Sequence, residues 1–362
     1  MKICIVGGGN LGTAMAAEFA SKNHAVNILT SKPEAWQKNI EADEIVRGGG
    51  LLKLKAKLNL VTADAAEAFD STDYIFVTLP SNVQKDFAKR VAPLVSDKMK
   101  FVMIPGFGGV EFLMQPVLKS GAELFGFQRV PFIARLKEYG KSVWFEKKAR
   151  LHLAKFSGGD IISTCREMEK LFSIPCEALN NYLCITLAPS NPVLHTSRLY
   201  SMLKDADSAI EQNKFFYADW NDAASEVLFK LDDEVQAICH ALKEVDLHSV
   251  LSLKVYYESK TISALTKKIR SIPSLSKISS PFKHIAQGLL PDYENRYFKC
   301  DFEFGLDIFL QFAEILKLNV PTMQNVMNWY RQRTKNFTRA VNLAEYGIKS
   351  ERNIYKFYST TN

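Results

Sequence analysis

Short apolar runs, turns and amphipathic stretches follow one another in a regular order along the first half of the chain. Each short apolar run ends in a turn, and a stretch with helical period then begins. The strands are expected at 2–6, 25–29, 73–80 and 100–104, and the helices at 13–20, 64–69 and 81–94. Because strands and helices alternate in this way, the pattern predicts an α/β fold with a doubly wound parallel sheet.

Two stretches in this half depart from the strand–helix order. Leucine and lysine alternate over 52–58, which predicts a strand with one solvated face. The β-like segments within 122–156 are expected to complete the sheet as an extension or a short meander. A basic groove along the lysines of 52–58 is the less favoured reading of that strand.

In the second half of the chain the apolar residues recur with a different spacing. After residue 180 the apolar positions are spaced as in helices, and a Ser-, Pro- and Lys-rich stretch interrupts them at 259–297. That stretch is expected to be a long loop or a set of broken helices. Long helices are expected at 207–258, 301–317 and 321–345. The sequence therefore predicts two domains, an α/β domain over 1–180 and an all-α domain over 181–362.

The turn after the first strand, residues 7–12, has the spacing G-x-G-x-x-G. In such a turn Gly7 permits the tight bend, Gly9 lets a pyrophosphate approach the backbone, and Gly12 lets the helix pack on the strand. The N-terminus of the following helix offers unpaired N–H donors to the phosphates. The position of the turn favours a Rossmann-type dinucleotide site over an ordinary tight turn. The cofactor-binding residues expected are Gly7, Gly9, Asn10, Leu11, Gly12, Thr30, Ser31, Lys32, Leu79 and Pro80.

The end of the second strand bears on which dinucleotide binds. NAD enzymes place an acid there to hold the ribose 2′-hydroxyl, whereas this strand ends in Thr30-Ser31-Lys32, and the first acid is Glu34. Hydroxyl groups and an ammonium suit a 2′-phosphate, which a carboxylate would repel. We therefore expect NADP to be preferred, with NAD as the alternative cofactor. The other interpretation is a simple turn in which Pro33 opens a helix.

Composition narrows the functional class. With 362 residues, of which 47% are hydrophobic, the chain has enough apolar residues for two cores. Its net charge of +7 suits anionic small molecules and does not indicate nucleic acid. No apolar run is long enough to span a membrane and the first residues form no signal peptide, so a cytoplasmic protein is expected. The six cysteines have no metal-ligand spacing and are expected to be reduced and buried.

Candidate catalytic residues occur near the start of a helix in the second half. Asn191 precedes Pro192, which fits the first position of a helix, and His195 follows one turn later. A polar Asn beside a titratable His suits a proton donor with an orienting group. From these residues alone, Asn191 is equally well explained as a helix cap and His195 as a structural histidine.

The chain resembles the opine dehydrogenases, which include octopine and N-(1-carboxyethyl)-norvaline dehydrogenases, over nearly its whole length. The residues that carry the resemblance are the turn 7–12, Thr78-Leu79-Pro80-Ser81, the turn 105–109, Arg129-Val130-Pro131-Phe132 with Arg135, Asn191-Pro192-x-x-His195, and Arg296-Tyr297 followed by Asp301 and Gly305-Leu306. The sequence departs from the family pattern at Phe302-Glu303-Phe304, where a turn with Val-Pro is common, and at Phe107, where a polar residue is commoner. These departures concern the substrate more than the reaction type.

The resemblance implies an NAD(P)H-dependent reductive condensation of an α-keto acid with the amino group of an amino acid. It also implies that His195 transfers a proton, that Asp301 orients it and that Asn191 completes the set. Arg296 is the expected clamp for a substrate carboxylate, with a surface arginine as the alternative. A homodimer is compatible with the resemblance. The competing interpretations are a ketopantoate reductase or glycerol-3-phosphate-type dehydrogenase, which would use a catalytic lysine, and a non-catalytic NADP-binding sensor.

Overall fold

The computed structural model describes residues 1–46, 48–205, 212–334 and 337–359, which form two compact units. The first unit is Met1–Thr186 together with Tyr358 and the residues after it, and the second is Leu187–Phe357. The sequence places the domain boundary at 180/181, a few residues earlier. The sequence pattern does not predict that Tyr358 belongs to the first unit. This assignment depends on tertiary contacts at the end of a single helix.

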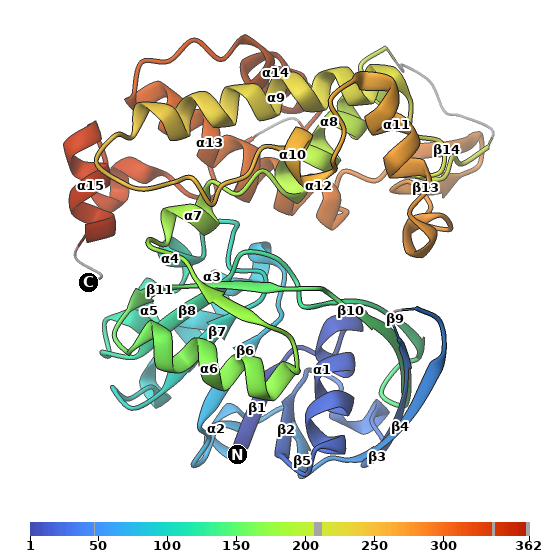
Figure 1. Cartoon of the computed structure of the whole chain (residues 1–362), viewed down its shortest axis with the longest axis vertical. Helices are drawn as coiled ribbons and strands as arrows, with labels where there is room; N and C mark the ends of the chain where they lie inside the picture. The colour runs from blue at the N-terminus through green and yellow to red at the C-terminus, as the bar shows by residue number, and fades with distance from the viewer. Residues whose placement is uncertain (47, 206–211, 335–336, 360–362) are drawn as a thin grey trace. The chain divides into compact units, whose positions relative to one another are not determined.

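The first unit is built on an eight-stranded sheet with the order β12-β11-β8-β7-β6-β1-β2-β5 (Figure 1). Its strands are β1 (Lys2–Val6), β2 (Ala25–Leu29), β5 (Leu60–Thr62), β6 (Tyr74–Val77), β7 (Lys100–Met103), β8 (Glu123–Phe127), β11 (Leu151–Ser157) and β12 (Cys176–Ala178). From β5 to β8 every neighbouring pair is parallel, and the order is that of a doubly wound dinucleotide-binding sheet. The predicted α/β fold class is confirmed. Successive strands are added on one side of β1 up to β5 and on its other side from β6 onward, so the strand order reverses between β1 and β6, which is the point where such sheets bind ligands.

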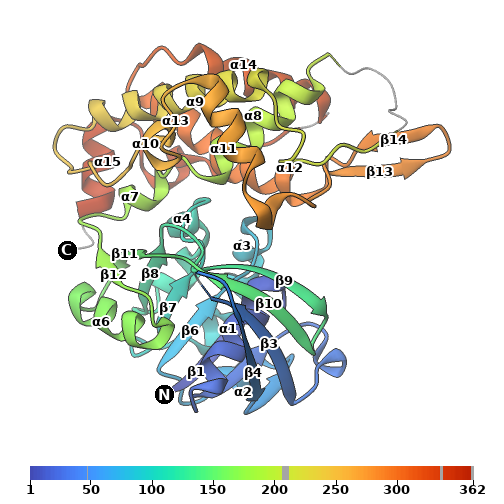
Figure 2. The same cartoon turned by 45° about the vertical axis from the view of Figure 1, so that its right-hand side comes forward.

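A second, four-stranded sheet in the same unit has the order β4-β3-β10-β9. It consists of β3 (Asn39–Ile45), β4 (Leu51–Lys57), β9 (Phe132–Glu138) and β10 (Ser142–Lys147). Helix α1 (Asn10–Ser21) contacts both this sheet and the main one, which explains why nine of its twelve residues are buried (Figure 2). The predicted strand at 52–58 corresponds to β4. The expectation for 122–156 is only partly right, because β8 and β11 extend the main sheet while β9 and β10 belong to the second sheet.

The other helices of the first unit lie mainly in its crossover connections. They are α2 (Ala65–Phe69), α3 (Ser81–Val91), α4 (Val110–Leu113), α5 (Gln115–Leu118), α6 (Ile161–Phe172) and α7 (Leu183–Thr186). The apolar runs of the strands supply the core, in which Ile3, Phe19 and Phe76 are fully buried. Phe172 of α6 makes edge-to-face contacts with Phe19 and Phe76, so the α6 side of the sheet is closed by aromatic packing.

The second unit is predominantly helical. Its main helices are α8 (Asn191–Leu203), α9 (Asp222–Ala241), α11 (Ile262–Arg270), α12 (Arg296–Asp301), α13 (Asp307–Ile315), α14 (Pro321–Arg333) and α15 (Glu351–Ser359), with a π-helical segment at Phe302–Leu306. A short helix, α10 (Leu253–Tyr256), and a hairpin of β13 (Phe282–Ile285) and β14 (Gly288–Pro291) complete it. No helix in the described ranges has the length and apolar character needed to cross a bilayer.

Several helix boundaries differ from the sequence prediction. The helix expected at 207–258 is α9 alone, followed by irregular chain and α10, and residues 207–211 of that prediction lie outside the described part. The helix expected at 321–345 ends at Arg333, and the one expected at 301–317 already begins at Arg296. The loop expected at 259–297 contains α11, which the Thr261 side chain caps, and the β13–β14 hairpin.

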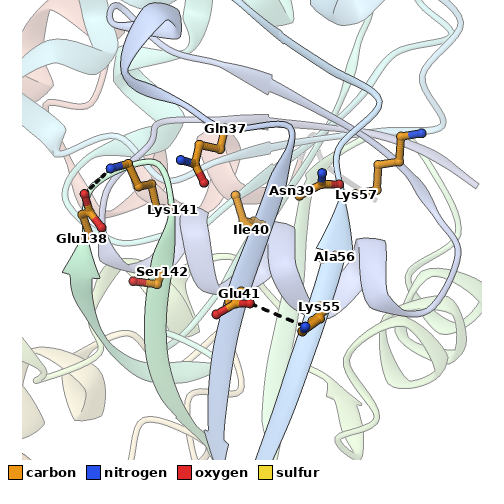
Figure 3. Close-up of a pocket in the computed structure, with 10 residues that line it drawn as sticks. All are labelled: Gln37, Asn39, Ile40, Glu41, Lys55, Ala56, Lys57, Glu138, Lys141 and Ser142. Atoms are coloured by element: carbon orange, nitrogen blue, oxygen red, sulfur yellow. Dashed lines mark hydrogen bonds and ion pairs between the residues drawn. The ribbon is translucent and has the colours of Figure 1, made fainter.

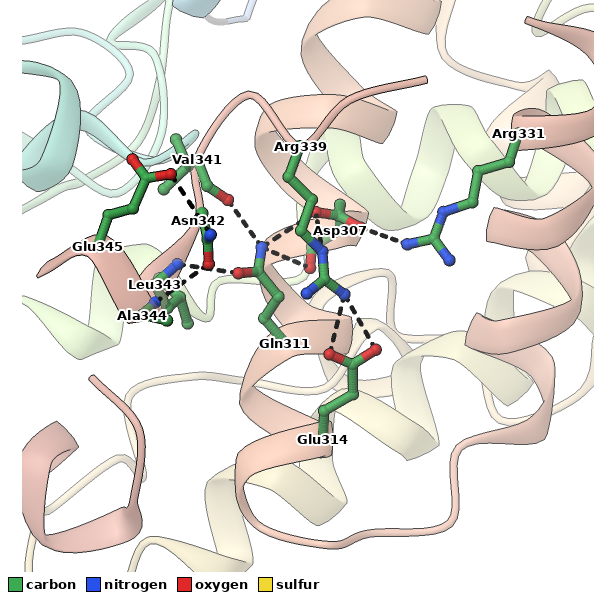
Figure 4. A network of polar contacts seen from close by, with 10 residues as sticks. All are labelled: Asp307, Gln311, Glu314, Arg331, Arg339, Val341, Asn342, Leu343, Ala344 and Glu345. Atoms are coloured by element: carbon green, nitrogen blue, oxygen red, sulfur yellow. Dashed lines mark hydrogen bonds and ion pairs between the residues drawn. The ribbon is translucent and has the colours of Figure 1, made fainter. Parts of the chain in front are cut away.

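A buried polar network fixes the segment after α14 against α13 (Figure 4). The fully buried Asp307 accepts a hydrogen bond from Arg331 at 2.8 Å and lies 3.4 Å from Arg339. Gln311 donates to the Val341 carbonyl and accepts from the Leu343 N–H. Because loss of one partner of a buried ion pair costs about 3 kcal/mol or more, this network explains how a segment without regular structure is held in one place.

Candidate active site

The glycine-rich turn has the geometry that its sequence predicts. Gly7 has a φ of 108°, which favours glycine, and its N–H donates to the Leu29 carbonyl at 3.0 Å. A Cβ on Gly12 would lie 1.9 Å from the Gly7 carbonyl oxygen, so helix α1 and strand β1 approach as only glycine allows. In contrast, a Cβ on Gly9 would meet nothing within 4 Å. The turn is therefore closed on its helix side and open above Gly9.

The open side of this turn coincides with the start of α1. Gly9 is the N-cap and supplies no side-chain acceptor to the first N–H groups of the helix. The Asn10 side chain accepts a hydrogen bond from the Leu136 N–H at 2.8 Å, so that side chain holds β9 rather than a ligand. Main-chain donors at a helix start beside open space fit the pyrophosphate of a dinucleotide. The binding role of Gly7, Gly9, Asn10, Leu11 and Gly12 stays a prediction.

The neighbouring strand end is joined directly to the glycine turn. The backbone N–H and the hydroxyl of Thr78 both donate to the Val6 carbonyl, at 2.9 and 3.0 Å. The half-buried Leu79 and the exposed Pro80 follow, and Pro80 is the residue before α3. Because β1 and β6 flank the reversal point of the sheet, these residues lie at the edge where the sequence analysis places a cofactor.

The end of β2 carries hydroxyl groups and a lysine, as its sequence indicates. Thr30 is buried, and its hydroxyl lies 3.1 Å from the hydroxyl of Tyr139. Ser31 and Lys32 are exposed, and the first acid, the exposed Glu34, lies on the short 3-10 helix Pro33–Ala35. Pro33 thus opens a helical turn, as the alternative interpretation of this segment expects. That turn leaves Ser31 and Lys32 accessible to a ligand.

A groove of about 740 Å³ lies elsewhere in the same unit, across strands β3, β4 and β10 (Figure 3). Two of its three lysines are opposite carboxylates: Lys55 lies 4.0 Å from Glu41, and Lys141 pairs with Glu138. A groove whose positive charges are mostly matched in this way offers an anion little net attraction. This geometry gives the basic-groove reading of 52–58 no support.

The second unit brings together three titratable side chains from distant parts of the chain. His195 on α8 lies with its Nδ1 atom 2.7 Å from Oδ2 of Asp301, the last residue of α12. Its Nε2 atom lies 2.8 Å from the hydroxyl of Tyr217, which stands in the segment before α9. His195, Asp301 and Tyr217 are only 3%, 5% and 5% exposed, so solvent screens these hydrogen bonds little.

These contacts define the direction of each hydrogen bond when Asp301 is ionised. A carboxylate can only accept, so the His195 proton is on Nδ1, and Nε2 of the neutral ring accepts from the Tyr217 hydroxyl. Burial raises the pKa of Tyr217 well above its usual value, and nearby Tyr297 adds to the shift, so this hydroxyl keeps its proton and remains a donor. The arrangement can store a proton and exchange it at Nε2.

Aromatic side chains surround the imidazole. Tyr297 stacks on His195 with ring centroids 4.1 Å apart and an interplanar angle of 24°. The guanidinium of the preceding residue, Arg296, lies over the ring of Tyr297, 5.3 Å from its centroid. Arg296 is exposed and pairs with no carboxylate among the residues that the structure describes. An accessible, unpaired guanidinium so close to the His195 stack can receive a carboxylate ligand.

The structure places Asn191 differently from the sequence analysis. Asn191 is the first residue of α8, Pro192 is the second, and Ser190 is the N-cap. The half-buried Asn191 side chain makes no hydrogen bond to His195 in the described chain, so neither the cap nor an orienting contact is present. One helical turn separates the two residues, and the orientation of the imidazole comes from Asp301 and Tyr217 instead.

Sequence reasoning missed Tyr217 and the residue that holds it. Arg198, one turn after His195, is buried and donates from Nε to the Phe216 carbonyl at 3.1 Å, while its guanidinium lies 6.0 Å from the Trp220 ring centroid. Arg198 thus anchors the segment that carries Tyr217. Burial lowers the pKa of Arg198 to about 10. No spacing motif links Tyr217 to His195, and the only signal was the aromatic cluster Phe215-Phe216-Tyr217 beside a tryptophan.

Metal chemistry has no support from the described side chains, among which no group of three or more His, Cys, Asp and Glu residues could hold an ion. The six cysteines form no disulfide in the described chain. The expectation that all six are buried is wrong for Cys176, Cys239 and Cys300, which are partly exposed because they lie at an edge strand or on the outer side of helices.

Comparison with known proteins adds to this geometry. Residues 178–334 match the family described as NAD/NADP octopine/nopaline dehydrogenase, alpha-helical domain, and residues 2–119 match the NAD-dependent glycerol-3-phosphate dehydrogenase N-terminus. Octopine dehydrogenase of Mizuhopecten yessoensis is 24% identical over 92% of this chain and 90% of its own length. Tauropine dehydrogenase of Arabella iricolor is 25% identical over 90% of both chains.

A solved structure shares the fold. Octopine dehydrogenase in complex with NADH and L-arginine superimposes with a TM-score of 0.82, at 20% identity, over 98% of this chain and 97% of that chain. The similarity to octopine and tauropine dehydrogenases thus extends through both units, whereas the match to glycerol-3-phosphate dehydrogenases is confined to the first.

Proposed function

We propose that this chain, which belongs to the opine dehydrogenase family, joins an α-keto acid to the amino group of an amino acid by NAD(P)H-dependent reduction. The chain is an oxidoreductase that acts on a CH–NH bond. Its product is then a secondary amine that carries two carboxylates. The single observation that supports the proposal most strongly is the buried pair of His195 and Asp301 beside the accessible guanidinium of Arg296.

Each residue of the second unit has a chemical task in this proposal. His195 takes a proton from the attacking ammonium group through Nε2 and the Tyr217 hydroxyl bonded to it, and gives it to the keto oxygen, which leaves as water when the carbon–nitrogen double bond forms. Asp301 keeps the ring oriented and stabilises it when it is positively charged. Arg296 holds a substrate carboxylate in bidentate geometry. When bound, the nicotinamide cofactor supplies the hydride that reduces the carbon–nitrogen double bond.

We also propose NADPH as the preferred cofactor. The support is the accessible Ser31 and Lys32 at the end of β2, where a carboxylate would favour NADH. The ammonium group of Lys32 would attract a bound 2′-phosphate and so stabilise the NADPH complex. The neutral hydroxyl group of Ser31 would not repel that phosphate. The main-chain donors at the start of α1 would hold the pyrophosphate of either cofactor.

The two competing functions, a lysine-dependent reductase and a non-catalytic NADP-binding sensor, explain the buried side chains of the second unit less well. A ketopantoate or glycerol-3-phosphate type of reductase would be expected to use a catalytic lysine, whereas the buried cluster of the second unit is built around His195. A non-catalytic NADP-binding sensor would have no use for a buried His–Asp pair, which costs desolvation to maintain. Both alternatives remain outcomes of the following test.

The test follows the oxidation of NADPH and NADH with a set of keto acids, each with and without pooled amino acids. We expect oxidation only when a keto acid and an amine are both present, and a secondary amine dicarboxylate as the product by mass spectrometry. Oxidation at the same rate without the amine would replace the proposal by a hydroxy-acid or ketopantoate type of reduction. Binding of NADPH without oxidation under any combination would favour the sensor.

A further inference from the structure

The side chains of Trp36 and Tyr139 lie close to Gly8, the second of the three consecutive glycines in the glycine-rich turn. A Cβ on Gly8 would lie 2.8 Å from Cζ2 and 3.2 Å from Nε1 of Trp36, and 3.0 Å from the Tyr139 hydroxyl. Tyr139 in turn shares a hydrogen bond with Thr30 at the end of β2. The two aromatic rings meet edge to face, with centroids 6.0 Å apart.

The Trp36 indole is the unexplained member of this cluster. It is only 9% exposed, and its Nε1 atom has no hydrogen-bond partner among the residues described. A buried N–H donor without an acceptor costs about 1–3 kcal/mol, and native proteins rarely keep one without a reason. Because Nε1 lies only 3.2 Å from the place where a Cβ on Gly8 would stand, a ligand bound beside the glycine turn could supply the missing acceptor.

The fold holds Trp36 and Tyr139 in place through a close backbone approach. The turn between β9 and β10 contains Gly140, whose φ of 69° suits glycine and whose carbonyl accepts from the Gln37 N–H at 3.0 Å. A Cβ on Gly140 would lie 2.3 Å from the Ala35 carbonyl oxygen. The four-stranded sheet is thus fastened to the segment after β2 at the two residues that flank the cluster.

We propose that Trp36 and Tyr139 form one wall of the adenosine subsite, and that the Trp36 indole N–H donates a hydrogen bond to an oxygen at the 2′ position of the adenosine ribose. In doubly wound sheets this ribose lies beside the end of the second strand, where Thr30 stands. The open space above Gly9 then receives the pyrophosphate, and the wall beside Gly8 receives the ribose. This inference rests on the dinucleotide dependence in the proposed function.

The first test measures binding of adenosine 2′,5′-bisphosphate by calorimetry, which needs no catalysis. Trp36→Phe keeps an aromatic ring and removes the donor, so its dissociation constant is expected to be about tenfold larger, as for a hydrogen bond to a charged group. Trp329→Phe is the matched control, because Trp329 in the second unit is 7% exposed and its Nε1 also has no partner among the described residues. The affinity of that variant is expected to be unchanged.

The second test reads the indole proton itself. In ¹H–¹⁵N spectra of the unaltered protein, the indole signal that is missing in Trp36→Phe should move on addition of the bisphosphate, and the Trp329 signal should not. Should Trp36→Phe fail to fold, Tyr139→Phe is expected to weaken binding by about threefold through loss of its hydroxyl.

The outcomes separate this inference from the proposed function. A bisphosphate that binds with equal affinity to Trp36→Phe and leaves the Trp36 indole signal unmoved overturns the inference alone. Absence of binding to the unaltered protein, of the bisphosphate and of NADPH and NADH alike, overturns the dinucleotide dependence and with it the proposed function. Binding of AMP that is weakened in Trp36→Phe, with binding of 2′-deoxyadenosine 5′-monophosphate that is the same in both proteins, places the hydrogen bond at the 2′ position.

Discussion

The Nδ1 atom of His195 lies 2.7 Å from Oδ2 of Asp301, although 106 residues separate them in the sequence. The helices that carry them pack together because the segment after Asp301 runs close to the start of α8. A Cβ on Gly305 would lie 2.6 Å from the Pro192 ring, so this approach requires glycine. The pair therefore depends on a tertiary contact that neither local sequence encodes by itself.

The first prediction concerns this pair. Replacement His195→Ala should lower kcat by about 100-fold or more, the usual effect of removing a general acid–base group. Asp301→Asn should give a loss of the same kind, because the amide keeps the shape but cannot stabilise a charged imidazole. Steady-state kinetics measure both effects, and calorimetric titration with NADPH should give dissociation constants close to that of the unaltered protein.

The double variant distinguishes a working pair from two independent residues. Its loss should be far smaller than the product of the two single losses, because residues that act as one unit are not additive. A folded His195→Ala protein with nearly normal turnover would instead assign His195 a structural role.

Tyr217 provides the second prediction. Its hydroxyl lies 2.8 Å from Nε2 and, with Asp301, fixes the orientation of the imidazole. Tyr217→Phe should lower kcat by about fivefold, as expected for loss of one hydrogen bond, and leave the affinity for NADPH unchanged. Tyr200→Phe on α8 is the control, since Tyr200 packs on Trp329, and it should leave kcat unchanged. An unchanged kcat in Tyr217→Phe would limit Tyr217 to packing.

The parallel strands of the main sheet could be predicted because each is a short apolar run that ends in a turn residue. Strand β3 could not, since its sequence from Asn39 to Ile45 mixes acids with apolar residues, and Ile40 and Ala42 are buried only because α1 packs on the second sheet. The helical stretch at 207–258 was overpredicted because apolar spacing continues past Leu242, while the chain leaves the helix there without a glycine or proline to mark the end.

The candidate site divides in a similar way. The glycine-rich turn could be predicted from the spacing of its glycines alone, because a side chain at the first glycine would require an unfavourable φ and one at the last would clash with nearby backbone. The partnership of His195 and Asp301 came from family resemblance. Tyr217 and Trp36 escaped notice because single aromatic residues far from any motif look like core residues, and only three-dimensional contacts distinguish them.

The third prediction tests cofactor choice. The unaltered protein should bind NADPH at least about tenfold more tightly than NADH, a difference of about 1.4 kcal/mol. Ser31→Asp should shift this preference toward NADH, because the new carboxylate repels a 2′-phosphate and accepts a hydrogen bond from a 2′-hydroxyl. Ser163→Asp, an exposed site on α6, is the control for added charge and should leave the ratio unchanged. Equal or tighter binding of NADH by the unaltered protein would contradict the prediction.

The fourth prediction concerns a buried carboxyl group in the first unit. Oε1 of Glu111 accepts hydrogen bonds from the hydroxyls of Thr186 and Tyr358, each at 2.6 Å, and the residue is fully buried. Burial raises the pKa of Glu111, and the two hydroxyl groups offset only part of that shift. Folding therefore makes protonation of this carboxyl easier than in the unfolded chain, and the same carboxyl holds Tyr358 in the first unit.

A raised folded-state pKa means that the stability contributed by protonated Glu111 is complete below the unfolded pKa of about 4.3 and is lost as pH rises toward the folded value. Glutamine keeps an acceptor for both hydroxyls and cannot ionise, so the Glu111→Gln protein should lose none of this stability. The free energy of unfolding of Glu111→Gln relative to the unaltered protein should thus increase as the pH rises above the unfolded pKa of about 4.3. Urea denaturation at several pH values measures the difference, with exposed Glu34→Gln as the control that should show no such trend. Parallel curves for Glu111→Gln and the unaltered protein would mean that folding does not raise the pKa of Glu111.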